Sequence, residues 1–78
     1  MAVSAYILIQ TEVGSGLKVA TTIREIPGIE EANDVTGPYD VIAKATARSV
    51  DELGRLVVGQ VQEIKGITRT VTCPVVNL

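Results

Sequence analysis

A chain of 78 residues has room for one small domain, which we place over residues 1–78. Apolar residues make up 46% of it and the net charge at pH 7 is −2, which favours a folded chain and argues against a basic surface that grips nucleic acid. Because the chain has no histidine and only one cysteine, it can form neither an intrachain disulfide nor a closed zinc site.

The first predicted element is a strand over Val3–Thr11, a stretch rich in Ile, Leu and Tyr. It is apolar on both sides, with Ala5, Ile7 and Ile9 on one and Tyr6 and Leu8 on the other. A strand that is covered on one face only alternates instead. The N-terminus has neither a basic segment nor a long apolar run, so we expect no signal peptide and no membrane span. An unpaired cysteine is typical of the reducing cytoplasm.

The next segments predict a helix and two strands. Residues 13–16 form a turn and helix start; two glycines there are too few for a phosphate-binding motif. A helical face then follows, made of Leu17, Ala20, Ile23 and Ile26, and Pro27-Gly28 ends the helix. Residues 29–36 predict a more polar strand, which Gly37-Pro38 breaks. In residues 41–47 the small apolar side chains at 41, 43, 45 and 47 alternate with Ile42, Lys44 and Thr46, the period of a half-buried strand.

A second helix and a last strand complete the chain. Ser49 followed by Glu52 three residues later is a capping-box signature. The apolar stripe of this helix consists of Val50, Leu53, Val57, Val61 and Ile64. Gly54 and Gly59 interrupt the helix, and we expect them to allow close packing against a neighbour. Residues 68–76 predict a β-branched strand with Pro74 at an edge or an end and Cys73 as an inert buried thiol.

The chain contains two copies of one unit. The segment Glu-Ile-Pro-Gly-Ile at 25–29 recurs as Glu-Ile-Lys-Gly-Ile at 63–67, so in both halves a helix ends at a glycine and a strand follows. Two strand–helix–strand units predict an α+β, ferredoxin-like βαββαβ fold, and the crossover rule puts both helices on one face of a four-stranded antiparallel sheet. The other face then needs a cover. We expect a second copy of the chain to supply it; the alternative is that a few apolar residues face water.

One loop is richer in functional groups than its turn requires. Gly37 and Pro38 set the backbone of the turn, whereas Tyr39 and Asp40 are not needed for it. Backbone groups left open by a glycine, together with the Asp40 carboxylate, suit a small zwitterion; the alternative is a simple connection. The threonines at 68, 70 and 72 share one face of the last strand, as strand formers or as hydroxyls lining an interfacial pocket. No residues predict catalysis, a cofactor or a metal site.

These segments together resemble a known family, the effector-binding (RAM) domain of the Lrp/AsnC, or feast/famine, transcription regulators. The residues that carry the resemblance are Ala-Tyr-Ile-Leu-Ile at 5–9, Ile-Pro-Gly-Ile at 26–29, Val-Thr-Gly-Pro-Tyr-Asp at 35–40 running into Val41, and Ile-Lys-Gly-Ile at 64–67 before Thr-Arg-Thr. The match covers essentially the whole chain. Because the chain begins at the first strand, it looks like the stand-alone form without the helix-turn-helix, for which direct DNA binding is not implied.

The resemblance to the family also implies an assembly and a ligand site that the residues alone do not predict. Family members pair sheet to sheet as dimeric α+β barrels, and the dimers form rings, often octamers, with amino acids bound between dimers. On this chain the implied ligand-binding residues are Val35, Thr36, Gly37, Pro38, Tyr39 and Asp40, with further contributions from Thr70 and Thr72.

We therefore expect a non-enzymatic amino-acid sensor that works as a homo-oligomer in the regulation of transcription. One alternative is a structural module that co-assembles with full-length Lrp/AsnC homologues. Another is a small dimeric α+β-barrel enzyme, since fold alone does not specify function. The absence of histidine and the presence of only two tyrosines as aromatic residues argue against the enzyme.

Overall fold

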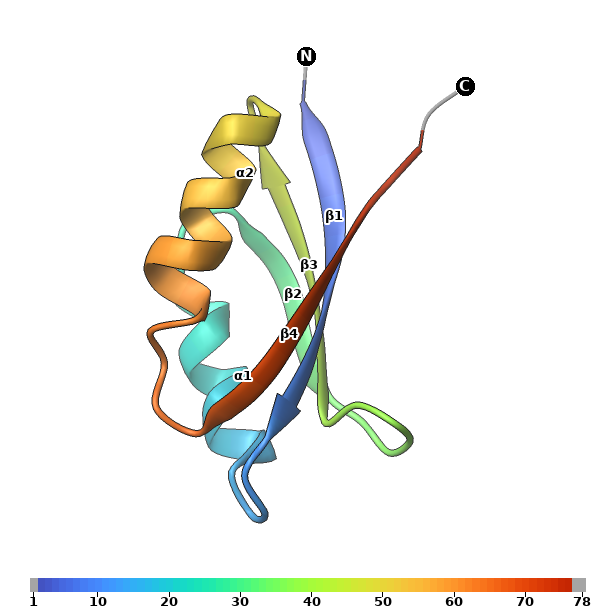
Figure 1. Ribbon diagram of the computed structural model, residues 1–78, viewed down its shortest axis with the longest axis vertical. Helices are drawn as coiled ribbons and strands as arrows, with labels where there is room; N and C mark the ends of the chain where they lie inside the picture. Colours follow the sequence, from blue (N-terminus) through green and yellow to red (C-terminus); the bar gives the residue numbers. More distant parts are fainter. Residues whose placement is uncertain (1, 77–78) are drawn as a thin grey trace.

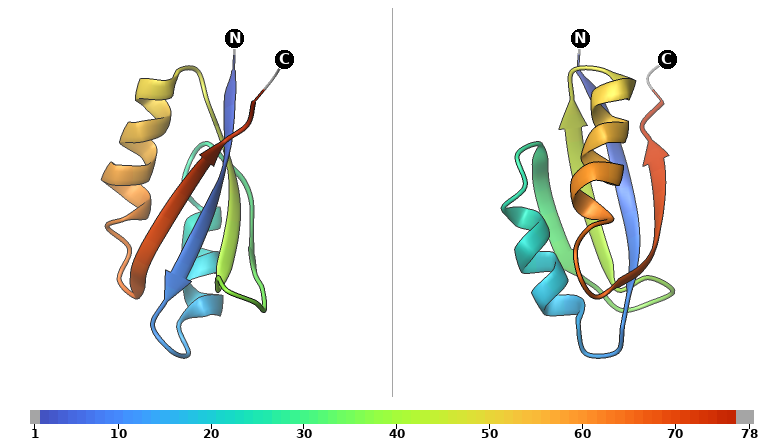
Figure 2. Two further views of the ribbon diagram at one scale, coloured as in Figure 1. Left: turned by 45° about the vertical axis from the view of Figure 1, so that its right-hand side comes forward. Right: turned by 60° about the vertical axis from the view of Figure 1, so that its left-hand side comes forward.

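The fold is a four-stranded sheet with two helices packed against one of its faces (Figure 1). The computed structural model describes residues 2–76. Its elements, in chain order, are β1 (Val3–Thr11), α1 (Gly16–Arg24), β2 (Ile29–Asp34), β3 (Val41–Ala47), α2 (Val50–Leu56), the π-helical segment η1 (Val57–Val61) and β4 (Ile67–Pro74). The strands lie in the order β2-β3-β1-β4, and every neighbouring pair is antiparallel. Figure 2 shows α1 and α2 on the same side, so the predicted ferredoxin-like arrangement is confirmed.

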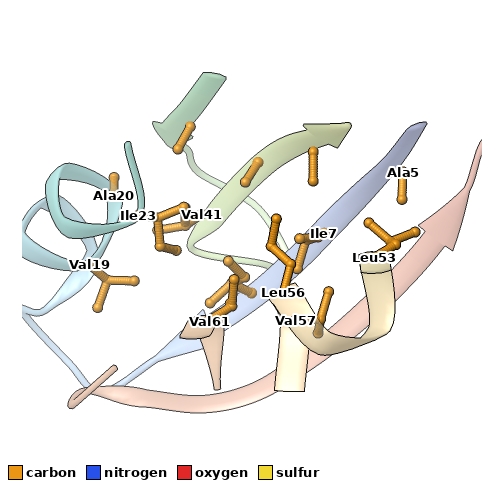
Figure 3. Packing of buried hydrophobic residues seen from close by; sticks show 14 of the residues in the cluster. Ala5, Ile7, Val19, Ala20, Ile23, Val41, Leu53, Leu56, Val57 and Val61 are labelled. Carbon is orange, nitrogen blue, oxygen red and sulfur yellow. The ribbon is translucent and has the colours of Figure 1, made fainter. Parts of the chain in front are cut away.

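The core fills the space between the sheet and the helices. The inward residues of β1 and β3 are those of the predicted alternation, and they meet side chains from both helices (Figure 3). The largest fully buried side chains are Ile7, Ile9, Val19, Ile23, Val41 and Val61. In β3 three of the four inward residues are alanines, whose short side chains let the helices approach the sheet closely. Each helix therefore owes its position to an apolar strip in the centre of the sheet.

The first turns of both helices depart from the predicted stripes. Leu17 is 64% exposed and Val50 is 69% exposed, although both were expected to face the core. Two residues outside the predicted stripes, Val19 in α1 and Leu56 in α2, are buried instead. The physical reason is that apolar residues spaced by three and four positions occupy a broad arc of the helix surface. Only the part of that arc that faces the sheet becomes buried.

The second helix is also not regular throughout. In η1 the Gln62 N–H donates to the Val57 oxygen at 2.9 Å, a bond that reaches five residues back and widens the turn. Apart from its chain neighbours and the backbone of its own helix, a Cβ added to Gly54 or Gly59 would meet no atom of residues 2–76 within 4 Å. Both glycines are exposed, so among the described residues no segment of the same chain packs against them, and the expected close packing against a neighbour stays a prediction for another molecule.

The repeated helix endings behave as predicted. Gly28 and Gly66, which occupy equivalent positions in the two halves, have φ angles of +99° and +103°. Only glycine adopts this left-handed conformation without strain, and it turns the chain from each helix into the following strand. The two strands are shorter than predicted, since β2 ends at Asp34 and β4 at Pro74.

The predicted cap of α2 is present at Ser49, but the Glu52 carboxylate bonds Arg48, the residue before the cap. The Ser49 Oγ accepts a hydrogen bond from the Glu52 N–H at 3.1 Å. Glu52 in turn bonds Arg48, whose Nε donates to Glu52 Oε2 at 3.0 Å. The hydrogen bond from Arg48 holds the pKa of Glu52 below its ordinary value. This interaction therefore stabilises the fold above the ordinary pKa of glutamate and is lost as the pH falls through the lowered value.

Candidate functional site

The face of the sheet that turns away from the helices, called the open face below, carries a mixture of apolar and charged side chains. Register places Tyr6 opposite Lys44 and Cys73, and Leu8 opposite Ile42 and Val71. Tyr6 is 42% exposed. Cys73 is exposed as well, so the prediction of a buried thiol is wrong for the described chain. The reason is that Cys73 shares the side of Tyr6, which neither helix covers.

A hollow of about 230 Å³ lies on the β2 side of the open face. It is lined by residues of three strands and by the first residue of the loop that follows β2, among them Tyr6, Glu31, Asn33, Val35, Ile42 and Lys44. The Lys44 Nζ lies 3.9 Å from Glu30 Oε2 and 5.9 Å from the centre of the Tyr6 ring. Thr46 Oγ1 also donates to Glu30 Oε2, at 2.8 Å. The hollow thus has an acidic edge, one cation and an aromatic wall.

The sequence did not identify this cluster as a site. Its members become neighbours only through the pairing of β2 with β3, in which Glu31 lies opposite Lys44 and Asn33 opposite Ile42. The signal that was available is the charge pair itself, since oppositely charged residues are favoured across neighbouring strands. To use that signal, one must know how β2 is aligned with β3. The irregularity between Ile29 and Glu31 shifts this alignment by one residue.

The loop over residues 35–40 joins β2 to β3 at one end of the sheet (Figure 1). Its ends are closed by the Val35 N–H, which donates to the Asp40 oxygen at 2.9 Å. Two further bonds tie the loop to β1: the Asp40 N–H donates to the Ile9 oxygen at 2.9 Å, and Asp40 Oδ2 accepts from the Thr11 N–H at 2.8 Å. Asp40 therefore anchors the loop to the central strand.

The remaining predicted residues of the loop are open to solvent. Thr36, Gly37 and Pro38 are exposed, and Tyr39 and Asp40 are half-buried. Gly37 has φ of +130°, and a Cβ added there would meet nothing within 4 Å among the described residues. The Pro38 oxygen accepts a bond from Gln10 Nε2 at 3.2 Å. The backbone of residues 36–38 is therefore accessible to solvent, while Asp40 holds the end of the loop against β1.

Thr70 and Thr72 lie apart from the loop. In the register they are opposite Ile9 and Ile7, whose side chains face the helices, so the two threonines are on the helix side of β4. Gln62 Nε2 donates to Thr70 Oγ1 at 3.0 Å, and Thr72 lines a groove between α2 and β4. Within the described part of one chain, β1 separates these threonines from the loop.

Other kinds of site receive no support from the described residues. Among residues 2–76 no three His, Cys, Asp or Glu side chains gather as they would around a metal ion. Over the same residues no helix is long and apolar enough to cross a membrane.

Comparison with known proteins decides the family. The sequence model of the Lrp/AsnC ligand-binding domain matches residues 4–77. The chain belongs to this family. This Lrp/AsnC domain is 39% identical over 72 residues to an uncharacterised HTH-type transcriptional regulator of Pyrococcus furiosus, PF0250, a match that covers 88% of the chain and 48% of the relative. The chain therefore spans about half the length of the curated relatives that it matches first.

One relative is not a DNA-binding regulator by name. The homocitrate synthase of Sulfurisphaera tokodaii is 30% identical over 54 residues, which are 69% of the chain and 12% of that protein. The similar stretch is therefore a small part of a larger protein.

Solved structures agree with the family. TTHA0845 from Thermus thermophilus superposes with a TM-score of 0.91 at 29% identity, covering 97% of this Lrp/AsnC domain and 95% of that chain. AsnC from E. coli gives a TM-score of 0.89 at 25% identity and is covered over 52% of its length. A transcriptional regulator from Neisseria meningitidis, NMB0573, solved in complex with L-Met, gives a TM-score of 0.84 at 16% identity, which shows the fold alone.

Proposed function

We propose that this Lrp/AsnC domain is a non-enzymatic amino-acid sensor that works as a homo-oligomer in the cytoplasm and contributes to the regulation of transcription. Two copies pack through their open faces, and dimers join into a ring in which the 35–40 loop contacts an amino acid. The threonines at 70 and 72 would reach that ligand from a neighbouring dimer, because within one chain they lie away from the loop.

The observation that carries the ligand site is the exposed loop on its fixed base. Thr36, Gly37 and Pro38 are exposed, and the space beside Gly37 is empty among the described residues, so a ligand can approach the backbone. Asp40 is already held in place by Thr11 through one carboxylate oxygen, so its charge is fixed beside the loop. A negative charge held in place suits the ammonium group of an amino acid, and neighbouring amides suit its carboxylate.

The observation that carries the dimer is the composition of the open face. Tyr6 is 42% exposed there, and Leu8, Ile42 and Val71 surround it at half-buried positions. Contiguous apolar patches of this kind are uncommon on monomers and mark contact surfaces. A domain of this size also gains stability from association, because its own core is small.

Titration calorimetry with each of the twenty amino acids tests the ligand site. We expect at least one to bind at millimolar concentration or below. Asp40→Asn keeps an oxygen that can accept from the Thr11 N–H but removes the charge, so we expect this variant to bind about tenfold more weakly while its thermal unfolding changes little. Glu63→Gln, which neutralises an exposed acid outside the loop, serves as the matched control.

Two results would contradict the ligand site. One is the absence of a binding signal for all twenty amino acids at millimolar concentration. The other is an Asp40→Asn variant that binds as tightly as the wild-type chain, because the loop would then not hold the ammonium group.

Co-assembly with longer homologues is the second candidate, and the relatives favour it. PF0250 is about twice as long as this chain and shares the same domain at 39% identity, so the two would present similar open faces. Native mass spectrometry of the chain mixed with this Pyrococcus furiosus regulator should then show mixed particles. Strictly separate particles would reject co-assembly with that regulator and would leave the homo-oligomer standing.

A further inference from the structure

Three polar side chains form a row across the open face, at the end of the sheet that carries the loop (Figure 1). Gln10 of β1 lies opposite Arg69 of β4, and residues directly opposite each other point to the same face. Asp40 lies on the other side of Gln10, one residue before Val41, which pairs with Ile9. An acid, an amide and a cation therefore follow one another from β3 across β1 to β4.

The loop approaches this row directly. Gln10 Nε2 donates to the Pro38 oxygen at 3.2 Å, so the middle of the loop is tied to the open side of β1. Asp40 accepts from the Thr11 N–H through Oδ2 at 2.8 Å, and its other carboxylate oxygen accepts no hydrogen bond from residues 2–76. The accessible backbone of the loop and the three side chains of the row therefore lie next to each other.

The cation of the row has no acidic partner in the described part of the chain. Arg69 is exposed, and neither of the two ion pairs among residues 2–76 includes it. Asp40 lies two strands away, because β1 is between β3 and β4, and this places the two backbones about 10 Å apart. The sheet thus holds an anchored negative charge and an unpaired positive charge on the two sides of Gln10.

The separation of these two charges suits the head group of an α-amino acid. Side chains of one row stand side by side, roughly perpendicular to the sheet. Two charge-assisted hydrogen bonds of about 2.8 Å each leave about 4 Å of the distance between the two strands for the atoms of a ligand. An ammonium group and a carboxylate on the same carbon atom fit this space. A diamine would bring a like charge to Arg69, and a dicarboxylate would bring one to Asp40.

We propose that Arg69 binds the α-carboxylate of an amino acid whose ammonium group is held at Asp40, while Gln10 between them keeps the loop in place. The inference rests on the ligand site proposed above and adds to it a cation from the same chain. A guanidinium group is always charged and binds a carboxylate through two parallel hydrogen bonds, so it complements the backbone amides of the loop. The ligand must then carry both a free α-ammonium group and a free α-carboxylate.

A second role for Arg69 has a different consequence. The residue lies on β4, an edge strand of the sheet, where a charged side chain prevents pairing with the strands of other molecules. An arginine that acted only in this way would leave the affinity for an amino acid unchanged. The effect of its charge on ligand affinity therefore separates the two roles.

Titration calorimetry with the twenty standard amino acids and their α-carboxamides tests the role of Arg69. We expect Arg69→Gln to weaken the binding of the tightest-binding amino acid about tenfold, because a hydrogen bond between two charged groups is lost. Arg69→Lys keeps the charge but not the paired hydrogen bonds and should lose about threefold. Arg69→Gln should also reduce the preference for the amino acid over its carboxamide about tenfold, since the carboxylate is the group that the arginine binds. Arg55→Gln, which removes the same charge from an exposed position of α2, is the matched control and should bind as the wild-type chain does.

The outcomes separate this inference from the proposed function. A wild-type chain that binds none of the twenty amino acids at millimolar concentration overturns both. A wild-type chain that binds one of them, together with an Arg69→Gln variant of equal affinity, overturns the inference alone and leaves the loop as the ligand site. An Arg69→Gln variant that loses the same factor for the amino acid and for its carboxamide also overturns the inference, because the arginine would then support the loop without touching the carboxylate.

Discussion

Ile42→Glu is expected to convert the proposed dimer into a folded monomer and to raise its Kd by at least about 100-fold. Ile42 is half-buried at the centre of the open face, and its side chain points away from the helices. In the proposed twofold dimer two copies of Ile42 lie in one interface, so the loss of about 1.5 kcal/mol of burial at each copy already amounts to about 3 kcal/mol. A carboxylate enclosed between two sheets is a further penalty.

Analytical ultracentrifugation across a dilution series gives the Kd, and circular dichroism shows whether the variant is folded. The matched control is Val58→Glu, which places the same charge at an exposed position of η1, on the other side of the sheet. Ile42→Ala serves as a milder variant and should weaken the dimer by a smaller factor without adding a charge. Unchanged dimer affinity in both Ile42 variants would mean that the open face is not the contact surface.

Gly28→Ala is expected to lower the free energy of unfolding by about 3 kcal/mol. The φ of +99° disfavours any residue with a Cβ, a penalty of about 1–2 kcal/mol. Space adds a second penalty, since a Cβ at this position would lie 2.7 Å from Leu56 Cδ1 and 3.1 Å from the Thr46 oxygen. Relief of such overpacking requires shifts that cost about 1–3 kcal/mol.

Urea denaturation at one fixed protein concentration measures the change, because association adds to the apparent stability. Gly54→Ala is the control. Gly54 lies in α2, and a Cβ added there would meet no atom of residues 2–76 within 4 Å beyond its chain neighbours and its own helix backbone, so alanine there should stabilise the chain by about 1 kcal/mol. Equal effects of the two substitutions would show that Gly28 is not held between β3 and α2.

The sequence predicted those structural features that depend only on residues close together in the chain. The helix endings at Gly28 and Gly66 follow from the conformational freedom of glycine, which acts whatever the rest of the chain does. The alternation of β3 was equally readable, because successive side chains of a strand point to opposite faces. The cap at Ser49 likewise depends only on residues within one turn of helix.

What the sequence missed depends on surfaces that form only after folding. The exposure of Leu17 and Val50 is decided by the area of sheet that the helices cover. The exposure of Cys73 depends on a face of the sheet that neither helix covers.

For the candidate site the sequence predicted the loop but not its surroundings. Gly37, Pro38, Tyr39 and Asp40 are adjacent in the chain, and the turn was therefore visible as a unit. The anchoring of Asp40 to Thr11 joins residues 29 positions apart, and the cluster around Lys44 needs the pairing of β2 with β3. Such contacts require the register, which a single sequence does not state.

The attachment of the loop to β1 links the two proposed activities. Asp40 is bonded to Ile9 and Thr11 at one end of β1, and the same strand carries Tyr6 and Leu8 on the open face. If binding of the proposed effector to the loop shifts this end of β1, it changes the free energy of the proposed association, and by linkage association then changes the affinity for the effector by the same factor. Concentration of the chain itself then becomes a variable that sets its sensitivity to the effector.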